Sequence, residues 1–230
     1  MSEAEKYTFA QFSDLLGYQL NDAESKHSPR NGIFYKGVMK IPLSCPRVSI
    51  IGSRVSSHQG LSNAKKITKF LVENNVIIVS GLARGIDTMS HKTAIECGGK
   101  TIAVLGTPLN KTYPKENISL QNHIMTHHMA ISQYPVNHHT TPKDFVLRNY
   151  TMAIISNATI IVEATDSSGT LYHAWEALRI GRPVFFCKEM LDEKLEWPKK
   201  ILNHGGMILD DPHDILQNIP SDSTMSYSDE

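Results

Sequence analysis

The sequence predicts an α/β fold built on a mostly parallel sheet, and three observations predict it. Short apolar runs rich in β-branched residues recur along the chain, each run ends in a turn of small residues, and helical patterns follow most of these turns. Strands that alternate with helices of about ten to fifteen residues form βαβ units, and the strands of such units are parallel. A chain of 230 residues is long enough to bury a proper core in one such domain.

Four strands are predicted, each with its own turn. They are Val48–Ile51 before Gly52-Ser53-Arg54, Val76–Val79 before Ser80-Gly81, Thr101–Leu105 before Gly106-Thr107, and Thr159–Glu163 before Ser168-Gly169-Thr170. Helical patterns cover residues 60–74, 86–95 and 171–180. Because all strands of a parallel sheet point the same way, we expect the four turns to gather along one edge of the sheet.

The two ends of the chain follow from the same patterns. Tyr7–Leu20 is expected to form a short amphipathic helix, so that residues 1–44 make an N-terminal helical extension and linker and residues 45–220 the main domain. A helix is expected at 197–202, a last strand at 206–209 and a helical turn at 211–216. The serine-rich, acidic tail 221–230 is expected to be disordered.

The turn from Ser80 to Asp87 is the clearest sign of a ligand site. A strand that ends in a glycine turn and opens a helix places unpaired N–H groups and the positive end of a helix dipole at one spot, which suits a phosphate. Arg84 adds a forked positive group there, and Arg54 does so in the first turn. Turn chemistry alone is the alternative. The expected phosphate contacts are Gly52, Ser53, Arg54, Ser80, Gly81, Arg84, Gly106, Thr107, Ser168, Gly169 and Thr170.

The segment from Phe145 to Asn149 adds features of a nucleic-acid site. Phe145 stands three residues before Arg148, so a stacking face lies beside a phosphate contact, as single strands require. Lys143 and Lys111 are expected to be further phosphate contacts. The alternative for Phe145 is a place in the core.

Six separated motifs resemble those of the DNA-processing protein A (DprA/Smf) family in order and spacing. They are Gly52-Ser53-Arg54, Ser80–Asp87 with His91, Thr101–Gly106, Tyr113–Asn117, Phe145–Asn149 and Ser168–Leu171, within about residues 46–183. The resemblance implies a Rossmann-like domain with helices on both faces of the sheet. It also implies single-stranded DNA binding, a role in recombination and DNA uptake, delivery of DNA to the RecA recombinase, and a homodimer. One departure is Tyr150, where the family has a second arginine: either the lost charge weakens the phosphate contact, or the tyrosine adds a stacking or hydroxyl contact.

Composition restricts the remaining possibilities. Lys+Arg and Asp+Glu are equal at 23 each, which argues against indiscriminate coating of DNA but not against a local basic groove. No apolar run has the length of a membrane span and the first residues do not form a signal peptide, so we expect a cytoplasmic protein without membrane partners. Cys45, Cys97 and Cys187 form no CxxC pair, which favours reduced thiols over a zinc site or disulfides.

Other site chemistries are weaker. His123 and His127 stand four apart but belong to no known metal motif, so neither a metal nor a cofactor is expected. The first turn lacks the GxGxxG of dinucleotide enzymes, and no P-loop pattern occurs. A nucleotide phosphoribohydrolase of the same superfamily and a nucleotide-binding sensor remain alternatives. The hydrolase signature places a glutamate where His173 stands; Glu176 lies three residues on, about 4.5 Å along the helix axis, so we expect no catalysis.

Overall fold

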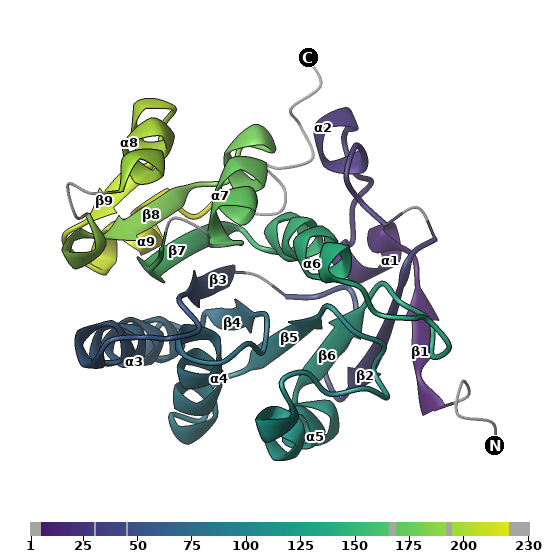
Figure 1. The fold of residues 1–230 in the computed structure, drawn as a ribbon. Helices are drawn as coiled ribbons and strands as arrows, with labels where there is room; N and C mark the ends of the chain where they lie inside the picture. The colour runs from purple at the N-terminus through teal and green to yellow at the C-terminus, as the bar shows by residue number, and fades with distance from the viewer. Residues whose placement is uncertain (1–5, 30, 45, 166–168, 192–194, 221–230) are drawn as a thin grey trace.

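The computed structural model describes residues 6–29, 31–44, 46–165, 169–191 and 195–220. Within them the strands are β1 (Thr8–Ala10), β2 (Ile33–Gly37), β3 (Arg47–Gly52), β4 (Ile77–Ser80), β5 (Thr101–Leu105), β6 (Met129–Ser132), β7 (Ala158–Glu163), β8 (Val184–Cys187) and β9 (Met207–Leu209). They form one sheet in the order β1-β2-β6-β5-β4-β3-β7-β8-β9 (Figure 1). The pairs from β6 to β9 in this order are parallel, whereas β2 pairs antiparallel with both β1 and β6.

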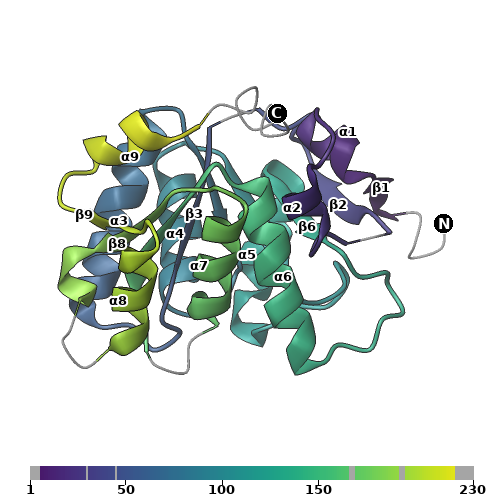
Figure 2. The same cartoon turned by 90° about the horizontal axis from the view of Figure 1, so that it is seen from above.

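Helices cover both faces of this sheet. They are α1 (Phe12–Leu16), α2 (Asp22–Ser25), α3 (His58–Glu73), α4 (Ile86–Glu96), α5 (Ile118–His127), α6 (Pro142–Ile155), α7 (Thr170–Arg179), α8 (Glu196–Asn203) and α9 (His213–Asn218), with short 3-10 turns η2 (Lys115–Asn117) and η3 (Lys188–Met190). α3, α4 and α5 lie on one face, and α6, α7 and α8 on the other (Figure 2). The predicted α/β fold is therefore confirmed. None of these helices is long and apolar enough to cross a membrane.

Four of the five predicted strands, those followed by small-residue turns, are β3, β4, β5 and β7, and their bounds differ from the prediction by at most one residue. β3 lies at the centre, where Ser49 pairs with Val79 of β4 on one side and with Thr159 of β7 on the other. The order of the strands along the chain reverses at this point. In open α/β sheets, ligands bind beyond the carboxyl ends of the strands at such a reversal.

The prediction of one helix from Tyr7 to Leu20 is wrong. Thr8–Ala10 instead forms β1, which pairs with β2, and only Phe12–Leu16 is helical. β2 in turn pairs with β6, where Phe34 lies opposite Ser132. Pairing with the sheet overrides the helical pattern because it satisfies backbone groups that a lone short helix leaves open. The N-terminal extension thus contains short helices but is also continuous with the main sheet.

Two parallel strands, β6 and β8, were not predicted. Near the C-terminus, α8, β9 and α9 fall where a helix, a strand and a helical turn were expected. The predicted disordered tail 221–230 lies outside the described residues.

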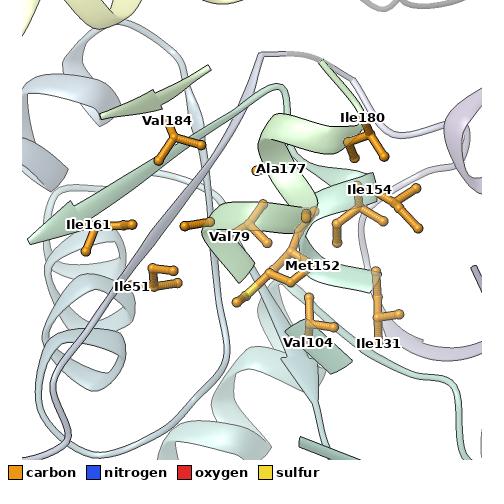
Figure 3. Packing of buried hydrophobic residues seen from close by; sticks show 14 of the residues in the cluster. Ile51, Val79, Val104, Ile131, Met152, Ile154, Ile161, Ala177, Ile180 and Val184 are labelled. Carbon is orange, nitrogen blue, oxygen red and sulfur yellow. The ribbon is translucent and has the colours of Figure 1, made fainter. Parts of the chain in front are cut away.

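The core between the sheet and the α6–α7 face is apolar. Met152 of α6 is 1% exposed and lies among Ile51, Val79 and Val104 of the sheet (Figure 3). Burying a side chain of this size stabilises the fold by about 1.5–3 kcal/mol. The packing fixes α6 against the carboxyl ends of β3, β4 and β5, which places the side chains of its first turns at that edge.

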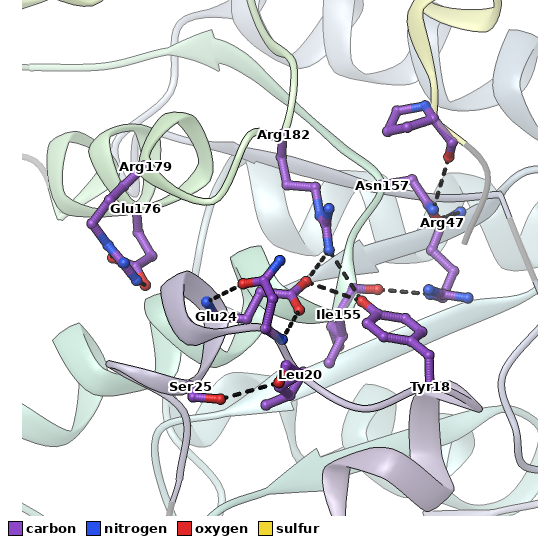
Figure 4. A network of polar contacts seen from close by, with 12 residues as sticks. Tyr18, Leu20, Glu24, Ser25, Arg47, Ile155, Asn157, Glu176, Arg179 and Arg182 are labelled. Atoms are coloured by element: carbon purple, nitrogen blue, oxygen red, sulfur yellow. Dashed lines mark hydrogen bonds and ion pairs between the residues drawn. The ribbon is translucent and has the colours of Figure 1, made fainter. Parts of the chain in front are cut away.

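A buried polar cluster fixes the N-terminal extension to the domain (Figure 4). Glu24 of α2 is 0% exposed and forms an ion pair with Arg182, which precedes β8. The hydroxyl of Tyr18 donates to Glu24 Oε1 at 3.1 Å and accepts from Arg182 Nη2 at 3.1 Å. Removing one partner of a buried pair costs about 3–5 kcal/mol, so the extension is strongly held.

Candidate nucleic-acid interface

A cavity of about 520 Å³ lies at the carboxyl edge of the sheet. Three segments of its lining contain predicted site residues. They are Gly52, Ser53 and Arg54 after β3, Arg148 and Asn149 of α6, and Gly169 and Thr170 at the start of α7. The structure therefore brings these seven residues together, as parallel topology requires. The other predicted residues that the structure describes do not line this cavity.

The turn after β4 holds a carboxylate of the protein itself. The N–H groups of Gly81 and Ala83 donate to Asp87 Oδ2 at 3.2 and 3.3 Å. Burial raises the pKa of the Asp87 carboxyl, while the charge of Arg148 and these two N–H groups act to lower it. Ser80 is also engaged, because its hydroxyl donates to Ile50 O at 2.7 Å. An anion bound at this turn would meet Asp87 in the place where sequence predicts a phosphate.

The N-terminus of α3 is occupied in the same way. The N–H of Ser57 donates to both Glu163 oxygens at 3.1 and 3.0 Å, and the Ser57 hydroxyl donates to Glu163 Oε2 at 3.0 Å. A Cβ on Gly60 would clash with this carboxylate, so the glycine is needed for its close approach. The first turn of α3 is thus capped from inside the protein.

Arg54 differs from every other arginine of the site. It is exposed, it lines the cavity, and no carboxylate of the described residues pairs with it. The backbone that carries it is fixed by Ser53, whose hydroxyl donates to Val55 O at 2.7 Å and accepts from Val55 N–H at 3.2 Å. A forked cation on a fixed turn is suited to bind a phosphate at the mouth of the cavity.

Arg148 is buried and bound to the protein. It is 5% exposed and donates to Gly81 O, to Val104 O at 2.7 Å and to Asn149 Oδ1 at 2.9 Å. Burial lowers the pKa of its guanidinium, and the charge of Asp87 opposes that shift. These contacts hold the carboxyl ends of β4 and β5 to α6, so the Nε and Nη1 donors of Arg148 are already engaged.

Arg84, Gly106 and Thr107 lie away from the cavity. Arg84 forms an exposed ion pair with Glu116. The Thr107 hydroxyl donates to Lys111 O at 2.9 Å. A Cβ on Gly106 would lie 2.6 Å from Phe145 Cδ1, so this glycine makes room for the aromatic ring. Ser168 lies outside the described residues.

Phe145 forms an aromatic pair over the carboxyl end of β5. Its half-buried ring lies 5.1 Å from that of Tyr113, between centroids, at an interplanar angle of 57°. Tyr113 is 53% exposed, and sequence reasoning had not assigned it a contact, although it opens one of the family-like motifs. Lys143, two residues before Phe145 in the sequence, is exposed and makes no ion pair with the described residues. Lys111 Nζ donates to the His138 carbonyl at 2.9 Å.

The residues of the alternative chemistries lie elsewhere. Glu176 is 3% exposed and binds Arg179 and His27, with Nδ1 of His27 at 2.8 Å, and it does not line the cavity. Tyr150 stacks on His27, with centroids 4.8 Å apart and rings at 22°, so it extends the packing of the N-terminal segment. His123 approaches His127 and His128, but no group of three metal-ligating side chains exists in the described part of the chain.

Known proteins resemble this chain in sequence. Residues 16–220 match the family model described as DNA recombination-mediator protein A. The DNA processing protein DprA of Streptococcus pneumoniae is 37% identical over 185 residues, which cover 80% of this chain and 65% of that protein. DprA of Bacillus subtilis is 31% identical over 198 residues, covering 86% and 67%, and protein Smf of Escherichia coli is 32% identical over 175 residues, covering 75% and 47%. The chain thus spans two thirds or less of these relatives' lengths.

Solved structures resemble it in fold. The X-ray structure of S. pneumoniae DprA aligns with a TM-score of 0.78 at 30% identity, covering 95% of this chain and 76% of that one. DprA of Helicobacter pylori, whose structure addresses its single-stranded DNA binding mode, aligns at 0.76 and 21% identity, covering 92% and 94%. A molybdenum cofactor binding protein of Rippkaea orientalis aligns at 0.55 and 15% identity over 76% and 94%, which reflects the shared fold. The chain therefore belongs to the DNA recombination-mediator protein A (DprA/Smf) family, as its motifs predict.

Proposed function

We propose that this protein binds single-stranded DNA across the cavity at the carboxyl edge of its sheet and does not itself catalyse a reaction. The observation that carries the proposal is Arg54, an exposed guanidinium at a cavity of about 520 Å³ that pairs with no carboxylate of the described residues. An aromatic pair, the half-buried Phe145 and the exposed Tyr113, lies at the same sheet edge. A phosphate contact combined with a stacking surface is what sequence-tolerant strand binding requires.

Phosphate binding in this proposal centres on Arg54 and the start of α7. Gly169 is the N-cap of α7, and both Gly169 and Thr170 line the cavity. The positive end of that helix dipole favours a phosphate facing Arg54 across the cavity. The turn from Ser80 to Arg84 contributes shape instead of charge, because Asp87 already receives its N–H groups.

The absence of a catalytic role is part of the proposal. Glu176, the glutamate closest in sequence to the hydrolase pattern, is held by Arg179 and His27. Asp87, the carboxylate that lines the cavity among the described residues, is buried beside Arg148. Delivery of DNA to RecA, a homodimer and a cytoplasmic location complete the proposal on the strength of family membership. A nucleotide sensor is the alternative, since the cavity has the volume of an ordinary small-ligand site.

The test compares Arg54→Ala with Arg84→Ala. Both variants remove one exposed arginine, but Arg84 is paired with Glu116 and lies outside the cavity. Arg54→Ala should weaken oligo-dT binding by about 1–3 kcal/mol, the scale of a lost charge-assisted contact, whereas Arg84→Ala should change it little. Fluorescence anisotropy with labelled oligo-dT and a panel of mononucleotides measures both. Equal losses in the two variants, or tighter binding of a mononucleotide than of the strand, would refute the proposal.

A further inference from the structure

A second cavity, of about 410 Å³, adjoins the first, and Thr165 lines both. It lies at the end of β7 on the side of α3. Val162, Ala164, Met190 and Leu195 form the apolar part of its lining. Its polar part comes from Gln59 and Asn63 of α3 and from Glu163 and Glu189.

Asn63 supplies an unused hydrogen-bond donor to this cavity. The side chain is 8% exposed, and its Oδ1 accepts from Gln59 Nε2 at 2.9 Å. Its amide nitrogen meets no acceptor among the described residues. This nitrogen is not one of the buried atoms without a partner, so solvent reaches it from the cavity, and an acceptor on a ligand can take the place of that water.

Two carboxylates determine which ligand fits. Glu163 is fixed by the backbone and hydroxyl of Ser57, and Glu189 is exposed in η3. The two carboxylates repel a phosphate in this cavity, whereas a neutral hydrogen-bond donor interacts favourably with them. The ligand must donate to the carboxylates, offer an acceptor to the Asn63 amide and present an apolar surface to Met190 and Leu195. A planar base with an exocyclic amino group does all three: its amino group donates, its edge binds an amide, and its ring packs against the two apolar side chains.

We infer that the second cavity binds a nucleobase with an exocyclic amino group, carried by the nucleotide whose phosphate lies at Arg54. This inference rests on the proposed function of the first cavity. The base can come from a DNA strand or from a free nucleotide, and its recognition chemistry is the same in both. Thr165 lines both cavities, so the phosphate and the base of one nucleotide would lie on either side of this residue.

The experiment compares oligo-dC with oligo-dU of equal length, since cytosine and uracil differ in the amino or oxo group at one ring position. The wild-type protein should bind oligo-dC at least about fivefold more tightly, the lower range for one good base contact. Asn63→Ala and Glu189→Gln should each reduce this preference to below about twofold. Glu73→Gln is the matched control, because Glu73 is an exposed carboxylate of α3 that pairs with Lys69 and does not line the cavity.

The outcomes distinguish base binding in the second cavity from strand binding at Arg54. If oligo-dC and oligo-dU bind equally, or if Glu189→Gln and Asn63→Ala both keep the preference, the second cavity is not a base site; Arg54→Ala would still weaken both oligonucleotides. If neither oligonucleotide binds, both ideas fail. Competition by dCMP but not by dUMP supports the inference with a free nucleotide as the source. A preference confined to the oligonucleotides supports it with DNA as the source.

Discussion

Salt dependence tests how many phosphates the site contacts. Two of the five predicted cationic contacts are engaged by the protein: Arg84 is paired with Glu116, and Arg148 is buried and bound to Gly81 and Val104. Arg54 at the cavity remains, together with Lys143 and Lys111, which do not line it. Each phosphate contact on a single strand contributes about −0.7 to the slope of log K against log salt, so three contacts give a slope of about −2.

A slope this small distinguishes three phosphate contacts from two and from many. Between 50 and 200 mM salt, affinity for oligo-dT should fall by about twentyfold, and in Arg54→Ala by about sevenfold, because one contact is lost. Anisotropy titrations at four salt concentrations measure both slopes. A slope steeper than about −4 would require many more phosphate contacts than the structure offers. An affinity that does not depend on salt would show that Arg54 makes no phosphate contact.

Three further predictions concern stacking, stability and chemistry. Phe145→Ala should cost about 1–3 kcal/mol in oligo-dT binding and leave mononucleotide affinity nearly unchanged in the same anisotropy assay; equal losses would argue against stacking. Burial lowers the pKa of His91 and of His173 to about 3, so below about pH 6.5 the unfolded chain takes up protons that the folded chain does not, and each histidine removes about 1.4 kcal/mol of stability per pH unit. His173→Gln should remove its share of that slope in urea unfolding between pH 7 and 5, and an unchanged slope would contradict this. Incubation with nucleoside monophosphates should release no base by chromatography; release abolished by Glu176→Ala would favour the hydrolase.

The fold was predictable where a strand carries its own pattern. β3, β4, β5 and β7 are apolar runs followed by small-residue turns, and all four were found within one residue. β1 and β2 have no such signature, because their place is set by pairing: β2 pairs with β6, and β1 pairs with β2. β8 is a four-residue run directly after Pro183, too short to distinguish from a buried helix turn by periodicity.

The site was predictable as a location but not in its contacts. Parallel topology places the turns at one edge, and the cavity lies there. The burial of Arg148 depends on packing, although one signal was available: Phe145, Arg148, Asn149 and Met152 share the spacing of one helix face, and Met152 is apolar. No pattern in the sequence shows that Asp87 fills its own turn, because that contact depends on how a side chain folds back on the backbone.

Under the proposed function, the two internal carboxylates favour a strand over a single nucleotide. Asp87 accepts from the N–H groups of the turn after β4, and Glu163 accepts from Ser57 at the N-terminus of α3 after β3; many nucleotide-binding folds hold a phosphate at such places. Phosphate affinity is then left to side chains such as Arg54, and each such contact is weak in water. A mononucleotide can engage one of them. A strand can engage Arg54, the lysines and the Phe145–Tyr113 pair together, and their contributions add along its length.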